Sequence, residues 1–110
     1  MTYSFQDIIE MFLKGETTGR AGSRSNPGNL SINGNQLIHY TTPIMERIDG
    51  EIIVNLSQYS IQTGRLQKQI KSVLEGEKYK TVIKVPRDYK GTLGDFPINE
   101  ERGGSNETTI

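Results

Sequence analysis

Residues Asn29 to Thr63 read NLSINGNQLIHYTTPIMERIDGEIIVNLSQYSIQT, and they set the architecture of this chain. Two turn dipeptides, Asn33-Gly34 and Asp49-Gly50, separate runs that are rich in apolar residues. Both central residues of a type I′ turn need a positive φ, which glycine adopts freely and Asn or Asp adopts at a small cost. The pattern therefore predicts two β-hairpins.

Each hairpin joins two strands, so four strands are expected in this stretch. Pro43 is expected to mark the bend between the hairpins, because proline is poorly tolerated inside a central strand. The continuous apolar run from Ile52 to Val54 predicts a strand that is covered on both faces. The four strands are expected at Asn29–Ile32, Asn35–Tyr40, Ile44–Ile48 and Glu51–Leu56.

A helix is expected on each side of these strands. Ser4 is expected to cap the first helix, which Gly15 ends, and Thr63 to cap the second, which Gly76 ends. Apolar residues recur at helical spacing in both segments. They are Phe5, Ile8, Ile9 and Phe12 in the first helix, and Leu66, Ile70, Val73 and Leu74 in the second.

A fifth strand is expected from Tyr79 to Val85, because YKTVIKV alternates and is rich in β-branched residues. The expected fold is a single α+β domain over residues 1–99, with an N-terminal helix, a four-stranded antiparallel meander, a second helix packed on the sheet, and the fifth strand. The polar residues 16–28 are expected to form a loop. Residues 100–110 have little to bury and are expected to be a disordered tail.

Composition excludes several classes of site. The chain has 110 residues, no cysteine and one histidine, so thiolate sites and multi-histidine metal sites are excluded. Lys plus Arg and Asp plus Glu balance at 13 each, without the basic excess that is usual in a nucleic-acid binder. A hydrophobic fraction of 33% indicates a thin core, which a homo-oligomer would remedy.

No segment of the sequence indicates a membrane partner. The longest apolar runs fall well short of the ~20 residues that span a bilayer. The N-terminus also lacks the layout of a secretion signal. A cytoplasmic location is therefore expected.

Two segments are candidates for binding an anion. Arg20 and Arg24 lie among small residues, either in a mobile solvated loop or in a loop that meets a phosphate or carboxylate. Tyr59, Thr63 and Arg65 lie where the second helix begins, and a helix N-terminus attracts anions. Tyr59 or Tyr40 could stack on a base. Alternatively, Thr63 and Ser60 only cap the helix, Tyr59 packs in the core and Arg65 is solvated.

No catalytic constellation is evident. His39 is expected on the same strand face as Leu37, as a structural or partly exposed residue, although a triad could use it. The carboxylates do not pair at a diagnostic spacing, and no dinucleotide or phosphate-loop glycine pattern is present. Arg65, Lys68 and Lys71 give the second helix a basic side, which leaves phosphate-backbone binding as an alternative.

A set of residues shared with other proteins runs through the centre of the chain. It comprises Gly28-Asn29-Leu30, Gly34, Leu37, Tyr40, Ile44, Arg47, Gly50, Ile52, Val54, Tyr59, Ser60, Thr63 and Gln67. This pattern resembles a family of small uncharacterised proteins of phages and mobile elements. Gln62 and Leu66 depart from it, because the family often has Thr and His at those positions.

The resemblance implies a phage-like origin, and short phage proteins without enzymatic activity often act as stoichiometric binders. The expected function is a non-enzymatic, phage-type binding protein in the cytoplasm of a host cell. It would be an anti-defence inhibitor or sponge, and its partner an anionic nucleotide-like ligand or a host defence protein. No cofactor, metal or catalytic residue is expected. The expected ligand contacts are Arg20, Arg24, Arg47, Tyr59, Thr63 and Arg65. The alternative is a nucleic-acid-associated accessory protein that binds through the second helix and the arginine-containing loop.

Overall fold

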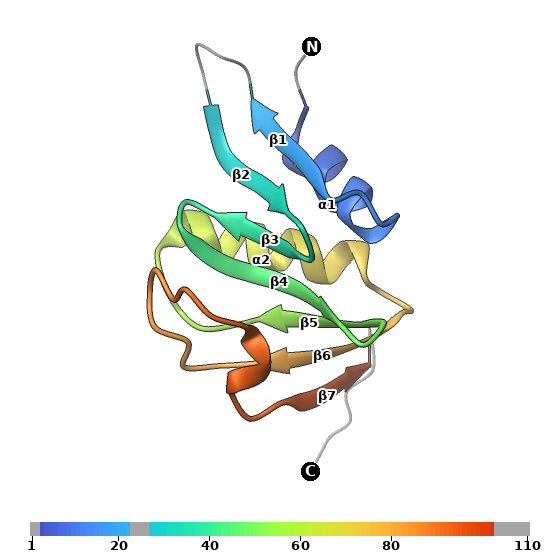
Figure 1. The fold of residues 1–110 in the computed structure, drawn as a ribbon, viewed down its shortest axis with the longest axis vertical. Helices are drawn as coiled ribbons and strands as arrows, with labels where there is room; N and C mark the ends of the chain where they lie inside the picture. Colours follow the sequence, from blue (N-terminus) through green and yellow to red (C-terminus); the bar gives the residue numbers. More distant parts are fainter. Residues whose placement is uncertain (1–2, 23–26, 103–110) are drawn as a thin grey trace.

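The computed structural model describes residues 3–22 and 27–102 of the chain. One sheet holds seven strands in chain order (Figure 1). Neighbouring strands are antiparallel except β5 and β6, which are parallel. The strands are β1 (Thr18–Gly22), β2 (Pro27–Asn33), β3 (Gln36–His39), β4 (Thr42–Ile48), β5 (Glu51–Asn55), β6 (Lys78–Val82) and β7 (Asn99–Arg102).

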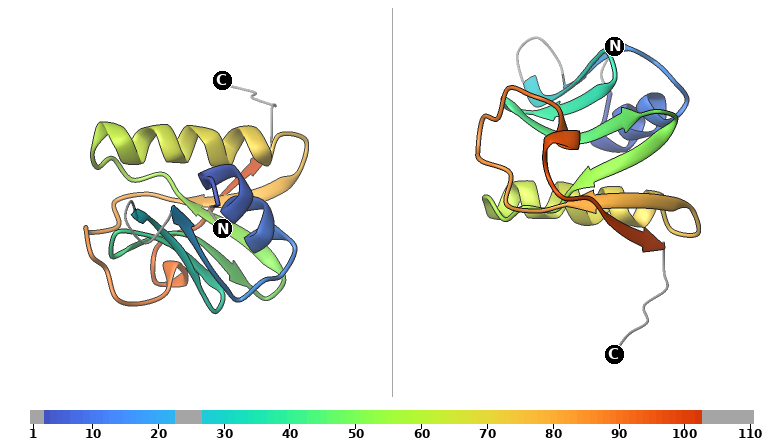
Figure 2. Two further views of the ribbon diagram at one scale, coloured as in Figure 1. Left: turned by 90° about the horizontal axis from the view of Figure 1, so that it is seen from above. Right: turned by 60° about the horizontal axis from the view of Figure 1, so that its bottom comes forward.

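Both α-helices lie on the same face of the sheet (Figure 2). Helix α1 (Phe5–Leu13) packs on β1 and β2, and helix α2 (Ile61–Val73) connects β5 to β6. A segment with a short 3₁₀ helix, η1 (Leu93–Asp95), covers β4 to β6 on the opposite face. The α+β class is therefore confirmed, with seven strands rather than the expected five.

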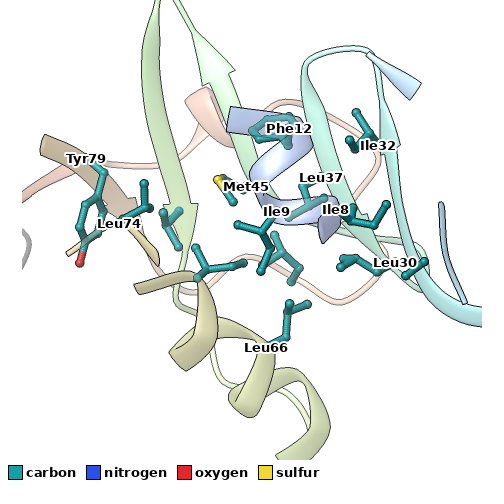
Figure 3. Packing of buried hydrophobic residues seen from close by; sticks show 14 residues of the cluster. Ile8, Ile9, Phe12, Leu30, Ile32, Leu37, Met45, Leu66, Leu74 and Tyr79 are labelled. Carbon is teal, nitrogen blue, oxygen red and sulfur yellow. The ribbon is translucent and has the colours of Figure 1, made fainter. Parts of the chain in front are cut away.

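The main core lies between the two helices and the sheet (Figure 3). Side chains from α1 interleave with Leu30, Leu37 and Met45 of the strands, and Leu66 of α2 closes the cluster. A smaller cluster of Ile53, Val82, Val85 and Leu93 lies under the η1 segment. Strand β5 is thus covered on both faces, as its apolar run predicted.

The two hairpin turns that were predicted at Asn33-Gly34 and Asp49-Gly50 are both two-residue turns. Asp49 and Gly50 have φ of 52° and 79°, as a type I′ turn requires, so this prediction is confirmed. The other turn is displaced by one residue, because Asn33 pairs with Gln36 and leaves Gly34 and Asn35 in the turn. Of those two residues, Gly34 alone has a positive φ, as in a type II′ turn.

The expectation for Pro43 is wrong. Pro43 lies inside β4 and pairs with Ile38, next to a register shift in the β3–β4 ladder. Such an irregularity tolerates a proline that a regular ladder would reject. The chain turns instead at Tyr40 and Thr41, since His39 pairs with Thr42.

The expected loop at residues 16–28 is also wrong, because β1 and the start of β2 lie within it. A Cβ built on Gly19 would lie 3.2 Å from Met11 Cε and 3.3 Å from Ile32 Cδ1. Helix α1 therefore leaves room only for small residues here, and small residues hide the strand from pattern analysis. Arg24 belongs to residues 23–26, which lie outside the described residues.

Three element ends differ from expectation. Ser4 caps α1 as predicted, accepting a hydrogen bond from the Asp7 N–H, but Ser60 rather than Thr63 caps α2. The fifth predicted strand is shorter, at Lys78–Val82. Residues 100–102 were expected to be disordered, yet they pair with β6 as part of β7, while 103–110 lie outside the described residues.

Buried Glu46 of β4 fastens the η1 segment to the sheet. Its carboxylate accepts hydrogen bonds from Thr92 Oγ1 at 2.6 Å, the Leu93 N–H at 2.7 Å and Gln36 Nε2 at 3.0 Å. Charge-assisted bonds of this kind are the stronger class in proteins. Glu46 thereby fixes the segment that brings Arg87 and Asp88 to the candidate site described next.

Candidate functional site

Tyr40 is the most unusual residue of the β3–β4 turn. Its φ is 59°, in the left-handed region that bulky side chains rarely adopt, and 55% of its surface is exposed. The Tyr40 N–H donates to the Asn29 carbonyl at 2.7 Å, which holds this backbone in place. Backbone strain of this kind gathers at functional sites. Tyr40 also lines four hollows of the molecule.

The first hollow has a volume of about 320 Å³ and lies where α2 begins, beside the β3–β4 turn. Its wall combines aromatic, hydroxyl and charged side chains. Arg87 is exposed and forms no ion pair among the residues that the structure describes. The lining residues are His39, Tyr40, Thr42, Ile44, Tyr59, Ser60, Gln62, Thr63, Arg87 and Asp88.

His39 is buried at the base of this hollow, with 4% of its surface exposed. Its Nδ1 lies 3.2 Å from Thr63 Oγ1, and Thr63 Oγ1 lies 3.2 Å from Ser60 Oγ. The His39 ring meets the Tyr40 ring edge-on at a centroid distance of 4.6 Å. Burial lowers the pKa of His39 below 6.5, so the imidazole is neutral at pH 7. It therefore offers one donor and one acceptor.

A second hollow of about 360 Å³ lies on the other side of Tyr40. Tyr40 Oη donates to Gln62 Oε1 at 3.2 Å, and both residues line both hollows. Arg65, which is exposed on α2, gives the second hollow its positive charge. The residues around it are Phe5, Gly28, Asn29, His39, Tyr40, Gln62, Arg65, Leu66 and Gln69.

A third hollow of about 660 Å³ lies on the sheet face away from the helices. Arg20 and Lys90 both line it, and its described lining includes no carboxylate. Arg20 points to this face because its neighbours Gly19 and Ala21 face α1. Arg20 also reaches Tyr40 in a smaller hollow of about 140 Å³.

The structure brings only some of the predicted contact residues together. Tyr59 and Thr63 line the first hollow, Arg65 the second, and Arg20 the hollows on the far side of Tyr40. Tyr59 also has a structural contact, since its hydroxyl donates to the Val85 carbonyl at 2.6 Å.

Arg47 does not join the site, contrary to expectation. Its Nη2 donates to the Phe12 carbonyl at 2.8 Å and the Leu13 carbonyl at 3.3 Å, and the guanidinium lies 4.9 Å from the centre of the Phe12 ring. The last carbonyls of a helix lack partners within the helix and carry partial negative charge. Arg47 therefore stabilises the end of α1.

Sequence analysis missed Gln62, Arg87 and Asp88. The first is an ordinary first-turn residue of α2, and the other two lie in a segment with no periodic pattern. Asp88 has a φ of 62°, and its N–H donates to Thr42 Oγ1 at 2.9 Å. Its carboxylate accepts a hydrogen bond from the Thr41 hydroxyl. These long-range contacts leave no local signal in the sequence.

The hydroxyls beside His39 do not complete a catalytic triad. A triad needs a carboxylate that orients the imidazole through its second nitrogen. Among the described residues, His39 Nε2 makes no hydrogen bond, and Asp88 is bonded to Thr41 instead. Residues 3–22 and 27–102 also hold no cluster of three or more acidic, histidine or cysteine side chains that could bind a metal.

Within those same ranges, neither helix has the length and apolar character needed to cross a bilayer. Comparisons with protein-family models, with curated proteins and with solved structures find no match to this chain.

Proposed function

We propose that this chain is a non-enzymatic binding protein, and that the first hollow takes a small anionic ligand with a flat ring, such as a nucleotide. The observation that carries the proposal is Tyr40. A half-exposed aromatic side chain is held on a left-handed backbone at the rim of a hollow that also contains Arg87, whose guanidinium forms no ion pair with another described residue. The surrounding structure holds Tyr40 in this strained conformation, and strained residues of this kind cluster at ligand-binding and catalytic sites.

Each part of an anionic nucleotide has a suitable partner here. The Tyr40 and Tyr59 rings offer surfaces against which a base can pack. The first N–H groups of α2 have no partner within the helix and carry partial positive charge. Arg87 adds a full charge and a forked set of donors that match a phosphate.

His39 suits recognition better than catalysis. The neutral imidazole can donate or accept one further hydrogen bond through Nε2, as a base edge or sugar hydroxyl requires. No carboxylate among the described residues prepares it to take a proton from Thr63. The proposal therefore includes no turnover, and a nucleotide incubated with the protein is expected to be recovered intact by chromatography.

The biological role that we propose follows from the resemblance to small phage proteins. A stoichiometric binder of a nucleotide-like immune signal would act as a sponge in the cytoplasm of the host cell. A binder of a host defence protein would act as an inhibitor. Self-association into a homo-oligomer is part of this proposal, because a small core gains from it.

A thermal-shift screen against nucleotides tests the proposed function. A ligand that binds only the folded chain raises Tm, by an amount that grows with ligand concentration. Arg87→Gln is expected to remove most of the shift. Lys78→Gln, at an exposed lysine of β6 outside the described hollows, is expected to leave it unchanged. No shift with any nucleotide would contradict the sponge and leave a protein partner as the binding target.

A second candidate function is association with nucleic acid. Arg65, Lys68 and Lys71 are exposed on α2, and no ion pair joins them to another described residue. Arg20 and Lys90 add positive charge on the opposite face. Binding to phosphate backbone would weaken steeply with salt and tolerate unrelated sequences. A fluorescence-anisotropy titration of a DNA oligonucleotide at two salt concentrations measures both properties.

A further inference from the structure

The contact between Tyr40 and Gln62 borders two hollows. Tyr40 Oη donates to Gln62 Oε1 at 3.2 Å, and both side chains are exposed. Tyr40, Gln62 and His39 all line the hollow that holds Arg87 and also the hollow that holds Arg65. The two hollows therefore have three lining residues in common, and two of these, Tyr40 and Gln62, form a side-chain bridge that borders both hollows.

Each hollow has its own cation. Arg87 and Arg65 are both exposed, and neither guanidinium has a hydrogen bond or an ion pair with another described residue. Asp88 is the only carboxylate among the described residues that line the two hollows, and it is bonded to Thr41 on the Arg87 side. A guanidinium thus stands on each side of the bridge, and on the Arg87 side it shares the hollow with the charge of Asp88.

The bridge is easily opened. It is one neutral hydrogen bond between exposed groups, and water replaces either partner when the bond breaks. The hollows measure about 320 and 360 Å³, and each lies near the lower limit of a small-ligand pocket. Joined, they offer room for a ligand larger than either hollow holds alone.

We infer that the two hollows are halves of one cleft, and that its ligand carries two separate phosphates, as a 5′-phosphorylated dinucleotide does with its terminal and internal phosphates. This inference rests on the proposed function, because it names the ligand class of the same site. Arg87 binds one phosphate and Arg65 the other. The bases lie beside Tyr40, and the bridge opens as the ligand enters.

Calorimetric titration with three probes tests the cleft. The probes are 5′-AMP, the dinucleotide ApA with one internal phosphate, and pApA with an additional terminal phosphate. We expect pApA to bind about tenfold more tightly than either of the others, since it engages both arginines. Arg65→Gln should remove that advantage and leave 5′-AMP binding within about twofold, whereas Arg87→Gln should weaken both. Lys78→Gln, at an exposed lysine of β6 that lines none of the described hollows, serves as the matched control and should change neither.

Two further variants test the bridge. Tyr40→Phe keeps the ring, and Gln62→Ala keeps Tyr40, but both remove the hydrogen bond. Each should raise the affinity for pApA relative to that for 5′-AMP by about twofold to fivefold, because bridge opening no longer opposes binding of the longer ligand. Equal affinities for pApA and 5′-AMP, with no effect of Arg65→Gln on pApA, would overturn the two-phosphate cleft and leave the first hollow as the site. No binding of any of the three probes would overturn the cleft and also contradict the sponge, which would leave a protein partner as the binding target.

Discussion

The imidazole of His39 and the hydroxyl of Thr63 lie 3.2 Å apart and join β3 to the first turn of α2. This contact fixes the base of the first hollow, because His39 belongs to the sheet and Thr63 to the helix. Thr63 Oγ1 also lies 3.2 Å from the cap residue Ser60, so the helix start and the sheet are held by one chain of polar groups.

The free energy of unfolding is expected to decrease as the pH is lowered, because of His39. Its folded-state pKa lies below 6.5, owing to burial, so the unfolded chain binds the proton first as pH decreases. The free energy of unfolding should therefore be lower at pH 5.5 than at pH 7.5, a window in which ordinary carboxylates stay ionised. Urea titrations at the two pH values measure it. His39→Gln should flatten this dependence, and an equally steep dependence in that variant would assign it to another group.

Arg47→Met should destabilise the fold without affecting ligand binding. The variant leaves two carbonyls at the end of α1 without their charged donor, at a cost of about 1–3 kcal/mol. Arg47→Lys keeps the charge but not the planar fork, so it should lose less stability than Arg47→Met does. Urea unfolding measures the stability, and titration of 5′-AMP measures binding. Loss of 5′-AMP affinity in a folded Arg47→Met protein would restore Arg47 as a ligand contact.

Glu46→Ala should lower the unfolding free energy by about 3–5 kcal/mol, because three donors lose a buried acceptor. Glu46→Gln keeps one carbonyl oxygen as an acceptor, so its unfolding free energy should decrease by less than that of Glu46→Ala. Glu51→Gln removes the exposed ion pair with Lys80 and should lose about 1 kcal/mol at most. Equal losses at positions 46 and 51 would show that Glu46 does not anchor the η1 segment.

Asp88→Asn should strengthen the binding of 5′-AMP. The carboxylate lines the same hollow as Arg87 and repels a phosphate that approaches it. Asparagine tolerates the positive φ of this position, so the backbone should be preserved. Isothermal calorimetry at low and high salt measures the gain, which should shrink as salt screens the repulsion. A weaker affinity in Asp88→Asn would indicate that the carboxylate accepts hydrogen bonds from the ligand.

Local signals explain which elements the sequence reveals. The type I′ turn at Asp49-Gly50 needs a positive φ at both residues, and few dipeptides adopt that conformation. The dipeptide alone therefore locates this hairpin in the sequence. Strand β1 was missed because Gly19 must be small to admit Met11 of α1, a tertiary requirement with no trace in local periodicity.

The site was harder to predict than the fold. Arg47 looks like a free strand cation in the sequence, and only the position of α1 shows that it is engaged. Gln67 is buried and donates to the Asn55 and Ser57 carbonyls, so it joins α2 to the end of β5. The left-handed backbone of Tyr40 depends on the β3–β4 register, which pattern analysis does not fix.

Tyr40→Asn separates the positive φ of this position from the aromatic contact with the ligand. Titration of the variant with 5′-AMP is the decisive measurement. Asparagine adopts a positive φ more readily than tyrosine, so stability should be unchanged or rise by up to about 1 kcal/mol. The aromatic wall is lost, and 5′-AMP affinity should fall by about tenfold or more. If the folded variant instead binds 5′-AMP as well as the parent chain does, the strained tyrosine does not serve binding and the hollow beside it is not the ligand site.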